Sequence, residues 1–353
     1  MTDLSRQLID EVSAACGKQR PLHIKGGGTK QQLCGRNTEG EPLNVAAHTG
    51  IVNYDPAELV ITARAGTPIT ELEVALDENK QMLSFEPPHF GSEATLGGTL
   101  ASNLSGPARP WSGSIRDLVL GVRLINGKGD HLQFGGQVMK NVAGYDVARL
   151  QAGALGCLGV ITEVSLKVIP QAETEITVVQ QASESEAITA MNSFSGVSRP
   201  LTGAAWVDGQ LYLRLAGAES AVKGTVRAWG GEQLGQDTTF WQDLREQRLR
   251  FFQSSSPLWR FSIRSNVGPL LADVATVIDW AGAQRWLYGD YQANELQMIA
   301  ERAGGHVCLF KGGDRRSEVQ HPLSPVAQQL QQRLKNAFDP KGILNPGRLY
   351  RWM

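Results

Sequence analysis

Three glycine-rich segments constrain this chain more than any other feature of its sequence. They occupy residues 26–29, 95–103 and 153–159. Because glycine has no side chain, backbone N–H groups in such segments can converge on an anion and form a nest. Each segment alone could be a structural turn. Together they favour one large, phosphate-bearing cofactor.

The glycine pattern does not fit the two commonest nucleotide-binding motifs. After Gly26 and Gly28, the third glycine position of a Rossmann fingerprint is occupied by Gln31, and no Walker A loop occurs in the sequence. NAD-dependent dehydrogenases and ATPases are therefore disfavoured. The formal net charge of -1 provides no basic field, so nucleic-acid binding is also disfavoured and any phosphate site must be local.

The length of 353 residues favours two packed domains over one. Strand-like runs at residues 59–66, 118–125 and 159–169 predict a first domain that mixes strands with helices. Between them, residues 85–113 form an almost uncharged stretch rich in Gly, Pro, Ser and Thr. A loop of that length inside a compact domain usually has a functional role.

The second half of the chain predicts an antiparallel α+β layer. A hairpin turn at Asp208-Gly209 joins two of its strands. The expected elements follow the βαββαβ order of a ferredoxin-like layer: strand 174–180, helix 185–194, hairpin strands 204–207 and 210–215, helix 219–229, strand 259–263, helix 294–303 and strand 306–310. The fold class is therefore α+β.

The cysteines and the N-terminus indicate the cellular compartment of the chain. Cys16, Cys34, Cys157 and Cys308 form no CxxC pair, so no iron–sulfur or zinc site is indicated and reduced thiols are expected. The N-terminus lacks the basic start and apolar core of a signal peptide. No segment reaches the roughly 18 apolar residues that span a bilayer. We expect a cytoplasmic protein, or one that is peripheral on a membrane.

Five segments recur in a characteristic order: KGGGTK at 25–30, TLGGTLASNLSG at 95–106, SGSIRDLVLGV at 112–122, the run at 138–168, and FDPKGILNPGRL at 338–349. As a set they resemble the FAD-binding PCMH-type (vanillyl-alcohol oxidase-like) flavoprotein family. The resemblance implies FAD as cofactor. It also implies an FAD-binding PCMH-type domain at residues 1–170, a cap domain at 171–324, and a C-terminal segment at 325–353 that returns to the flavin site.

The resemblance also assigns cofactor contacts, although Thr99 and Leu155 depart from the Asn and Glu that are common in the family. The implied pyrophosphate residues are Gly26, Gly27, Gly28 and Thr29. A second loop of Thr95, Gly97, Gly98, Thr99 and Ser102 is implied to contact pyrophosphate and ribityl, with Ser114 and Asp117 flanking the same channel. Gly156, Gly159 and Ile161 are implied at the adenosine end, and Asn345 beside the isoalloxazine.

Four further segments are more specifically similar to the FAD-binding subunits of bacterial glycolate oxidase: EPPHFGSEAT at 86–95, RPWSGSIRD at 109–117, GGQVMKNVAGYD at 135–146 and IDWAGAQRWL at 278–287. This similarity implies a complex that oxidises glycolate to glyoxylate. The implied partners are a catalytic FAD subunit and an iron–sulfur subunit, and the complex could hold the chain peripherally at the inner membrane.

No catalytic residue can be assigned from the sequence. The resemblance to catalytic relatives of this fold implies a histidine-rich run in the cap that binds a metal. In this chain His306 and His321 lie outside any such run. No metal site is therefore predicted. Arginines beside aromatic residues could orient a carboxylate or form a packed edge. They occur in Trp259-Arg260, Arg264, and Trp280 with Arg285-Trp286.

Three functions stay open on these grounds. The missing histidine run favours an electron-transfer flavoprotein subunit that works beside a separate hydroxy-acid-oxidising flavoprotein. The alternative is a self-sufficient FAD-dependent 2-hydroxy-acid oxidoreductase whose substrate is held by the cap arginines. A flavin-free scaffold is the third possibility, and the intact glycine set argues against it.

Overall fold

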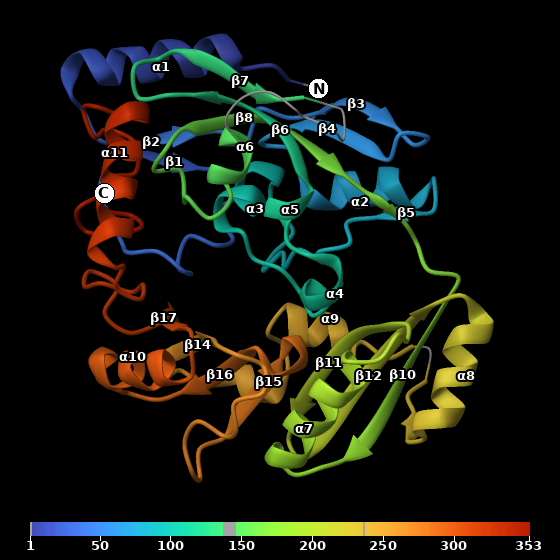
Figure 1. Cartoon of the computed structure of the whole chain (residues 1–353). Coiled ribbons are helices and arrows are strands. Elements are labelled where there is room, and N and C mark those ends of the chain that lie inside the picture. The colour runs from blue at the N-terminus through green and yellow to red at the C-terminus, as the bar shows by residue number, and fades with distance from the viewer. Residues whose placement is uncertain (1, 137–145, 236) are drawn as a thin grey trace.

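The computed structural model describes residues 2–136, 146–235 and 237–353 and divides into two halves, each built on its own sheet (Figure 1). The first half contains the N-terminal strands and helices together with the C-terminal segment. The second half contains an eight-stranded sheet with helices packed on it. The short helix α4 (Arg109–Ser112) lies between the halves.

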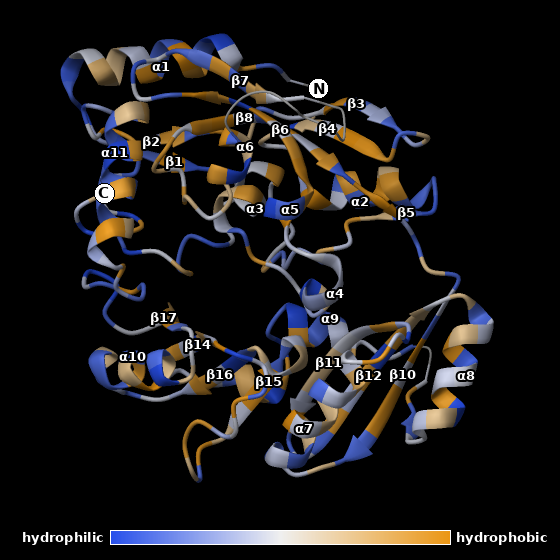
Figure 2. Cartoon of the chain, in the orientation of Figure 1, coloured by the Kyte–Doolittle hydropathy of each residue, from blue (hydrophilic) through white to orange (hydrophobic). Residues whose placement is uncertain are grey.

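The first half is built on a five-stranded antiparallel sheet with the order β3-β4-β8-β6-β7. Helix α1 (Ser5–Lys18) covers one face, and α2 (Ile69–Asp77), α3 (Leu96–Ser102) and α5 (Ile115–Leu118) cover the other (Figure 1). Hydrophobic residues concentrate on its central strands, as Figure 2 shows, because both faces are buried. The strands are β3 (Ile51–Asp55), β4 (Val60–Arg64), β8 (Val160–Lys167), β6 (Val119–Ile125) and β7 (His131–Gly135).

A smaller pair of strands connects the N-terminal and C-terminal parts of the chain. Strand β1 (Leu22–Lys25) pairs in parallel with β2 (Glu41–Asn44). After helix α11 (Pro325–Phe338), Leu344 forms an isolated parallel bridge with Leu22 on the strand's other side. The C-terminal segment therefore lies directly against the strand that leads into the first glycine-rich loop.

The eight-stranded sheet of the second half consists of two four-stranded units with the same topology. The first unit has the order β13-β10-β12-β11 and the second β15-β16-β14-β17, and the units join where Trp206 pairs with Ile278. Each unit is fully antiparallel with its first and third strands central, which is ferredoxin-like. The strands are β10 (Thr174–Gln181), β11 (Leu201–Val207), β12 (Gln210–Gly217), β13 (Glu232–Gln233), β14 (Leu258–Ser262), β15 (Thr276–Asp279), β16 (Gln284–Tyr288) and β17 (His306–Lys311).

The expected single ferredoxin-like layer is therefore two. The first unit carries both of its helices, α7 (Glu184–Ser195) and α8 (Glu219–Trp229). The second carries α10 (Ala293–Arg302) but has an irregular segment between β14 and β15 where the other helix would be. Because that helix is missing, no helical periodicity marks the start of a second unit in the sequence.

The stretch at residues 85–113 is also more ordered than a loop. It contains α3, whose N-cap Thr95 accepts a hydrogen bond from the Gly98 N–H at 3.2 Å, and then α4. Helix α2 begins after Pro68, and the preceding Thr67 hydroxyl accepts a hydrogen bond from the Gly50 N–H at 2.9 Å. The other short elements are β5 (Gln81–Met82), β9 (Ile169–Pro170), α6 (Val147–Leu150), α9 (Phe240–Arg245), and the 3₁₀ turns Arg250–Gln253 and Trp280–Gly282.

The same stretch fastens the two halves together. Glu86 pairs with the buried guanidinium of Arg214 at 2.7 Å, and its other oxygen accepts the Ala108 N–H at 2.8 Å. The Trp280 indole donates to the Gly106 carbonyl at 2.9 Å. The stretch therefore contacts the second half through a buried ion pair and a backbone carbonyl.

Two expectations from the sequence concern the cysteines and membrane-spanning helices. Cys16, Cys34, Cys157 and Cys308 are all free thiols, as expected. Within the described ranges, no helix combines the length and the apolar character required to cross a membrane.

Candidate flavin site

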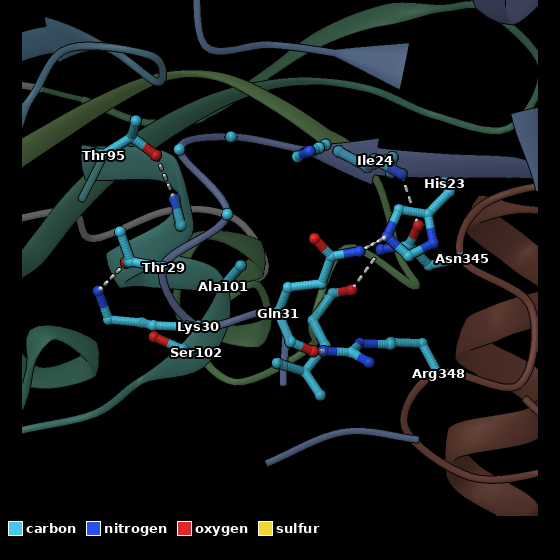
Figure 3. A pocket seen from close by; sticks show the side chains of 16 residues that line it. His23, Ile24, Thr29, Lys30, Gln31, Thr95, Ala101, Ser102, Asn345 and Arg348 are labelled. Carbon is cyan, nitrogen blue, oxygen red and sulfur yellow. Dashed lines mark hydrogen bonds between the residues drawn. The ribbon is translucent and has the colours of Figure 1, made fainter. Parts of the chain in front are cut away.

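The first and second glycine-rich segments and the C-terminal segment meet at one pocket (Figure 3). Its volume of about 100 Å³ is below the roughly 300 to 1,000 Å³ of complete ligand pockets, so it suits one part of a dinucleotide. The predicted site residues in its lining are Gly26, Gly27, Gly28, Thr29, Thr95, Gly98, Ser102 and Asn345.

The first glycine-rich loop is held so closely against residues 93–95 that Gly26 and Gly27 leave no room for a side chain. A Cβ on Gly26 would lie 2.6 Å from the Thr95 hydroxyl, and one on Gly27 would lie 1.5 Å from the Glu93 carbonyl oxygen. Gly28 has φ +77°, a conformation that glycine adopts without strain. The loop therefore exposes backbone rather than side chains to the pocket.

The second segment contributes only part of its predicted set to the pocket. Thr95, Gly98 and Ser102 line it. Gly97 instead packs against β4, where its N–H donates to the Ala65 carbonyl at 2.7 Å. Thr99 is a buried residue of α3, and its hydroxyl has no hydrogen-bond partner among the described residues.

Asn345 closes the pocket from the C-terminal side. Its Oδ1 accepts the Ile24 N–H at 2.7 Å, and its Nδ2 donates to the Leu155 carbonyl at 2.7 Å. The residue has φ 41°, in the left-handed region that asparagine tolerates better than most side chains. One side chain thus ties together strand β1, the third glycine-rich segment and the C-terminal segment.

The remaining predicted contacts lie outside this pocket. Ser114 and Asp117 form the capping box of α5, in which the serine N–H and hydroxyl both donate to one carboxylate oxygen. Gly156 lies beneath Asn345, where a Cβ would meet Nδ2 at 2.7 Å. Gly159 packs on Leu124, and Ile161 is buried in β8. The roles of Gly156, Gly159 and Ile161 at the adenosine end, and of Ser114 and Asp117 beside the channel, stay predictions.

Five polar residues of the pocket were not predicted as ligands: His23, Lys25, Lys30, Gln31 and Arg348. The Gln31 amide lies 3.2 Å from the His23 ring, and Arg348 donates to the backbone of Gln31 and Arg36. Burial, followed by the charge of Arg348, lowers the pKa of His23, so its ring is neutral at pH 7. Alternation along β1 and the position of Arg348 in NPGR could have indicated these residues.

Lys30 is a largely buried cation of this pocket. Its Nζ lies 3.3 Å from the His89 carbonyl oxygen and 3.5 Å from the Thr29 hydroxyl, and it forms no ion pair within the described part of the chain. Burial lowers its pKa to about 8, and the charge of Glu246 only partly offsets this. An anion bound in the pocket would supply the missing counter-charge.

A second, larger cavity of about 870 Å³ lies between the halves of the molecule. We refer to it as the chamber. Ser102 and Leu155 belong to the linings of both cavities, so the chamber adjoins the pocket. Arg109 enters it from α4, while Arg260 and His306 line it from the cap strands β14 and β17.

The other residues noted in the cap have different surroundings. Arg264 is exposed at the chamber wall, with its Nε 3.4 Å from the Ala303 carbonyl oxygen. Arg285 is fully buried and donates to the Gly282 and Val267 carbonyls, which is a packing role. His321 lies 3.6 Å from Glu301. No group of three or more His, Cys, Asp or Glu residues that could hold a metal occurs in the described portion.

Two of the sequence motifs extend into residues that the structure does not describe. The run at residues 138–168 and the segment 135–146 include residues 137–145, which lie outside the described residues. The remainder of the longer run forms α6, the third glycine-rich segment and strand β8.

Comparison with known proteins agrees with this site. Residues 5–135 match the model of an FAD binding domain, and residues 311–349 match that of the C-terminal domain of FAD linked oxidases. These two ranges contain the first two glycine-rich segments and the C-terminal strip that meet at the pocket.

Individual relatives extend the similarity over the whole chain. The chain is 46% identical to glycolate oxidase subunit GlcE of Escherichia coli, over 99% of this chain and 98% of that protein. It is 27% identical to a D-lactate dehydrogenase of Archaeoglobus fulgidus, over 97% of this chain and 89% of that protein, and 32% identical to glycolate oxidase subunit GlcD of Bacillus subtilis, over 48% and 37%. In fold it resembles a solved alkyldihydroxyacetonephosphate synthase with a TM-score of 0.67 at 17% identity, covering 97% of this chain and 75% of that one.

Proposed function

The chain belongs to the GlcE family of glycolate oxidase subunits, an FAD-linked oxidoreductase family, and from this premise we propose that it is the FAD-binding subunit of a complex that oxidises glycolate to glyoxylate. The observation that carries the proposal is the pocket in which two glycine-rich loops and Asn345 converge. The residues there suit a dinucleotide, because a close-packed backbone and an uncompensated lysine present hydrogen-bond donors and positive charge to a phosphate.

Specific residues would hold the cofactor. The backbone of Gly26, Gly27 and Gly28 and the segment from Thr95 to Gly98 would bind the pyrophosphate, with Lys30 supplying charge. Asn345 would fix the C-terminal edge of the site. FAD would supply the capacity to accept two electrons and release them one at a time, while the chain supplies binding, orientation and exclusion of water.

Partner subunits follow from the family, because both GlcE and GlcD are named as subunits of glycolate oxidase. We extend this to an electron relay in which a separate catalytic FAD subunit and an iron–sulfur subunit work beside this chain. Through those partners the chain would be peripheral at the inner membrane. The division into an FAD-binding domain at 1–170, a cap at 171–324 and a returning segment at 325–353 also belongs to this proposal, and the two separate sheets support it.

One observation favours the alternative of a self-sufficient hydroxy-acid oxidoreductase. The chamber beside the pocket contains Arg109, Arg260 and His306, and these residue types can anchor a carboxylate and accept a proton. The two proposals differ in how the flavin obtains its electrons.

Anaerobic stopped-flow mixing separates the two proposals. The purified chain is mixed with millimolar glycolate while the visible absorbance of the flavin is followed. The relay predicts slow bleaching by the chain alone and fast bleaching once the catalytic partner subunit is added. Bleaching by the chain alone within about a second, the time scale of an ordinary turnover, would replace the relay by the self-sufficient enzyme.

A further inference from the structure

The chamber has an unusual charge composition. Arginine and histidine side chains line it from both halves of the molecule, and none of the described residues in its lining is Asp or Glu. Arg109 comes from the first half, whereas Arg260 and His306 come from adjacent cap strands. A cavity that collects cations without any acid is electrostatically incomplete until an anion enters it.

The two arginines are oriented by aromatic rings rather than by carboxylates. The Arg109 guanidinium lies 4.5 Å from the Trp280 ring centroid, and that of Arg260 lies 5.4 Å from the Phe310 centroid. Neither forms an ion pair in the part of the chain that the structure describes, and the buried Arg260 Nε has no hydrogen-bond partner there. Ring stacking fixes their direction, and the side-chain hydrogen bond of Arg260 to Cys308 leaves further guanidinium donors available.

The charges in the chamber also act on one another. Burial and then the charge of Arg260 lower the pKa of Arg109. Burial lowers the pKa of His306, and the charges of Arg260, His321 and Arg109 lower it further. The one acid whose charge reaches Arg109, Asp117, already accepts both Ser114 donors in the capping box.

Two buried arginines of the chain, Arg214 and Arg315, have acceptors for their guanidinium groups. Arg214 pairs with Glu86 at 2.7 Å and also donates to the Thr202 carbonyl. Arg315 donates to the carbonyl oxygens of Gly35, Leu309 and Phe310. Arg214 and Arg315 are therefore provided with acceptors, whereas Arg109 and Arg260 face a cavity.

We propose that Arg109 and Arg260 form a binding site for the carboxylate of a small 2-hydroxy or 2-oxo acid, with His306 placed to hydrogen-bond the oxygen on the adjacent carbon. The planar guanidinium fork matches a carboxylate, and Trp111, Trp280 and Ile263 provide apolar wall for the carbon backbone. The inference rests on the proposed function. It concerns binding, and holds whether the flavin takes electrons from this acid or from a partner subunit.

Oxalate is the probe for this site, because it carries carboxylates and has no hydrogen on carbon that a flavin could remove. Oxalate affinity is measured by isothermal titration calorimetry on the purified FAD-loaded chain, and flavin content is measured separately. The variants are Arg260→Met, Arg109→Met and the conservative Arg260→Lys. Arg302→Met, an exposed arginine at the end of α10 outside the chamber lining, is the matched control.

We expect oxalate to bind the unmodified chain, and Arg260→Met and Arg109→Met each to weaken binding about tenfold or more, as for hydrogen bonds to a charged group. Arg260→Lys should recover part of the loss, and Arg302→Met should bind as tightly as the parent. The inference is overturned if oxalate does not bind, if either methionine variant binds it normally, or if inorganic phosphate binds as tightly as oxalate. Flavin content distinguishes these results from failure of the proposed function, since a chain that holds FAD and ignores oxalate refutes only the chamber site.

Discussion

The Oδ1 atom of Asn345 accepts the backbone N–H of Ile24 at 2.7 Å, across 321 positions of sequence. The contact places the C-terminal segment at the entrance of the first glycine-rich loop. Since the same side chain also donates to the Leu155 carbonyl, the geometry of the pocket depends on contacts of Asn345 with residues far away in the sequence.

Replacing Asn345 by Asp should weaken both folding and flavin binding. The isostere keeps the acceptor for Ile24 but places a carboxylate oxygen against the Leu155 carbonyl, with a cost of about 1–3 kcal/mol in unfolding free energy. Thermal unfolding and FAD titration measure the two effects. Asn336→Asp on the exposed face of α11 is the control and should change neither. A normal FAD affinity in Asn345→Asp would remove this residue from the site.

Gly28 permits a test of the phosphate assignment that separates charge from shape. A substitution at Gly27 would clash with the Glu93 carbonyl, whereas a Cβ on Gly28 would meet only the flexible ends of Lys25 and Gln31, at 3.3 and 3.8 Å. We expect Gly28→Asp to bind FAD at least about tenfold more weakly than Gly28→Asn, because the two differ in charge beside the same anion. Fluorescence titration of FAD compares them. Equal affinities would place the pyrophosphate elsewhere.

Lys30 predicts the pH dependence of FAD affinity. Its pKa is lowered to about 8 by burial, so above that pH the flavin-free chain has a neutral amine in the pocket. Binding a diphosphate should favour the ammonium, and affinity should therefore fall as pH rises through about 8. In Lys30→Met the affinity should be weaker at pH 7 and flat with pH. Lys18→Met, an exposed change on α1, should keep the parent profile. A profile in Lys30→Met like that of the parent would contradict this role.

Asp279 predicts how the stability of the folded chain depends on pH. Burial raises its pKa to about 7, with Glu86 adding to the shift and the Trp280 N–H and Arg214 opposing it. Between about pH 4 and 7 the folded chain retains a proton that the unfolded chain has lost. The free energy of unfolding should therefore decrease as pH rises over this window, by at most about 1.4 kcal/mol per unit from this group.

Urea unfolding at several pH values tests the role of Asp279. Asp279→Asn should remove this contribution and give a flatter profile between pH 4 and 7. If the parent and the variant lose stability in parallel, other groups determine the trend.

The glycine loops were predictable from sequence because their chemistry is local, whereas the NPGR strip was assigned to the site only by its resemblance to the flavoprotein family. A backbone that must approach an anion or a neighbouring loop requires glycine, and Gly27 shows how strictly, at 1.5 Å from the Glu93 carbonyl. Several strands of both sheets were predictable for a similar reason, since the apolar run of β8 and the partial alternation along β12 reflect burial of the strand itself.

The parts that could not be predicted depend on contacts between distant segments. Arg109 and Arg260 meet in one chamber only because the stretch at 85–113 docks on the cap through Glu86 and Arg214. Lys30 resembles any loop lysine until its burial is known. Similarly, Ser114 and Asp117 were expected beside the flavin channel, and their spacing is equally that of a helix capping box.

The most direct test of the account is the flavin content of the purified chain. After removal of free cofactor and denaturation of the protein, the released flavin is identified and counted by chromatography. The account predicts one FAD per chain in the parent, and loss of FAD in Gly28→Asp with retention of the fold. A folded parent chain that carries no FAD and takes up none when FAD is added would contradict it.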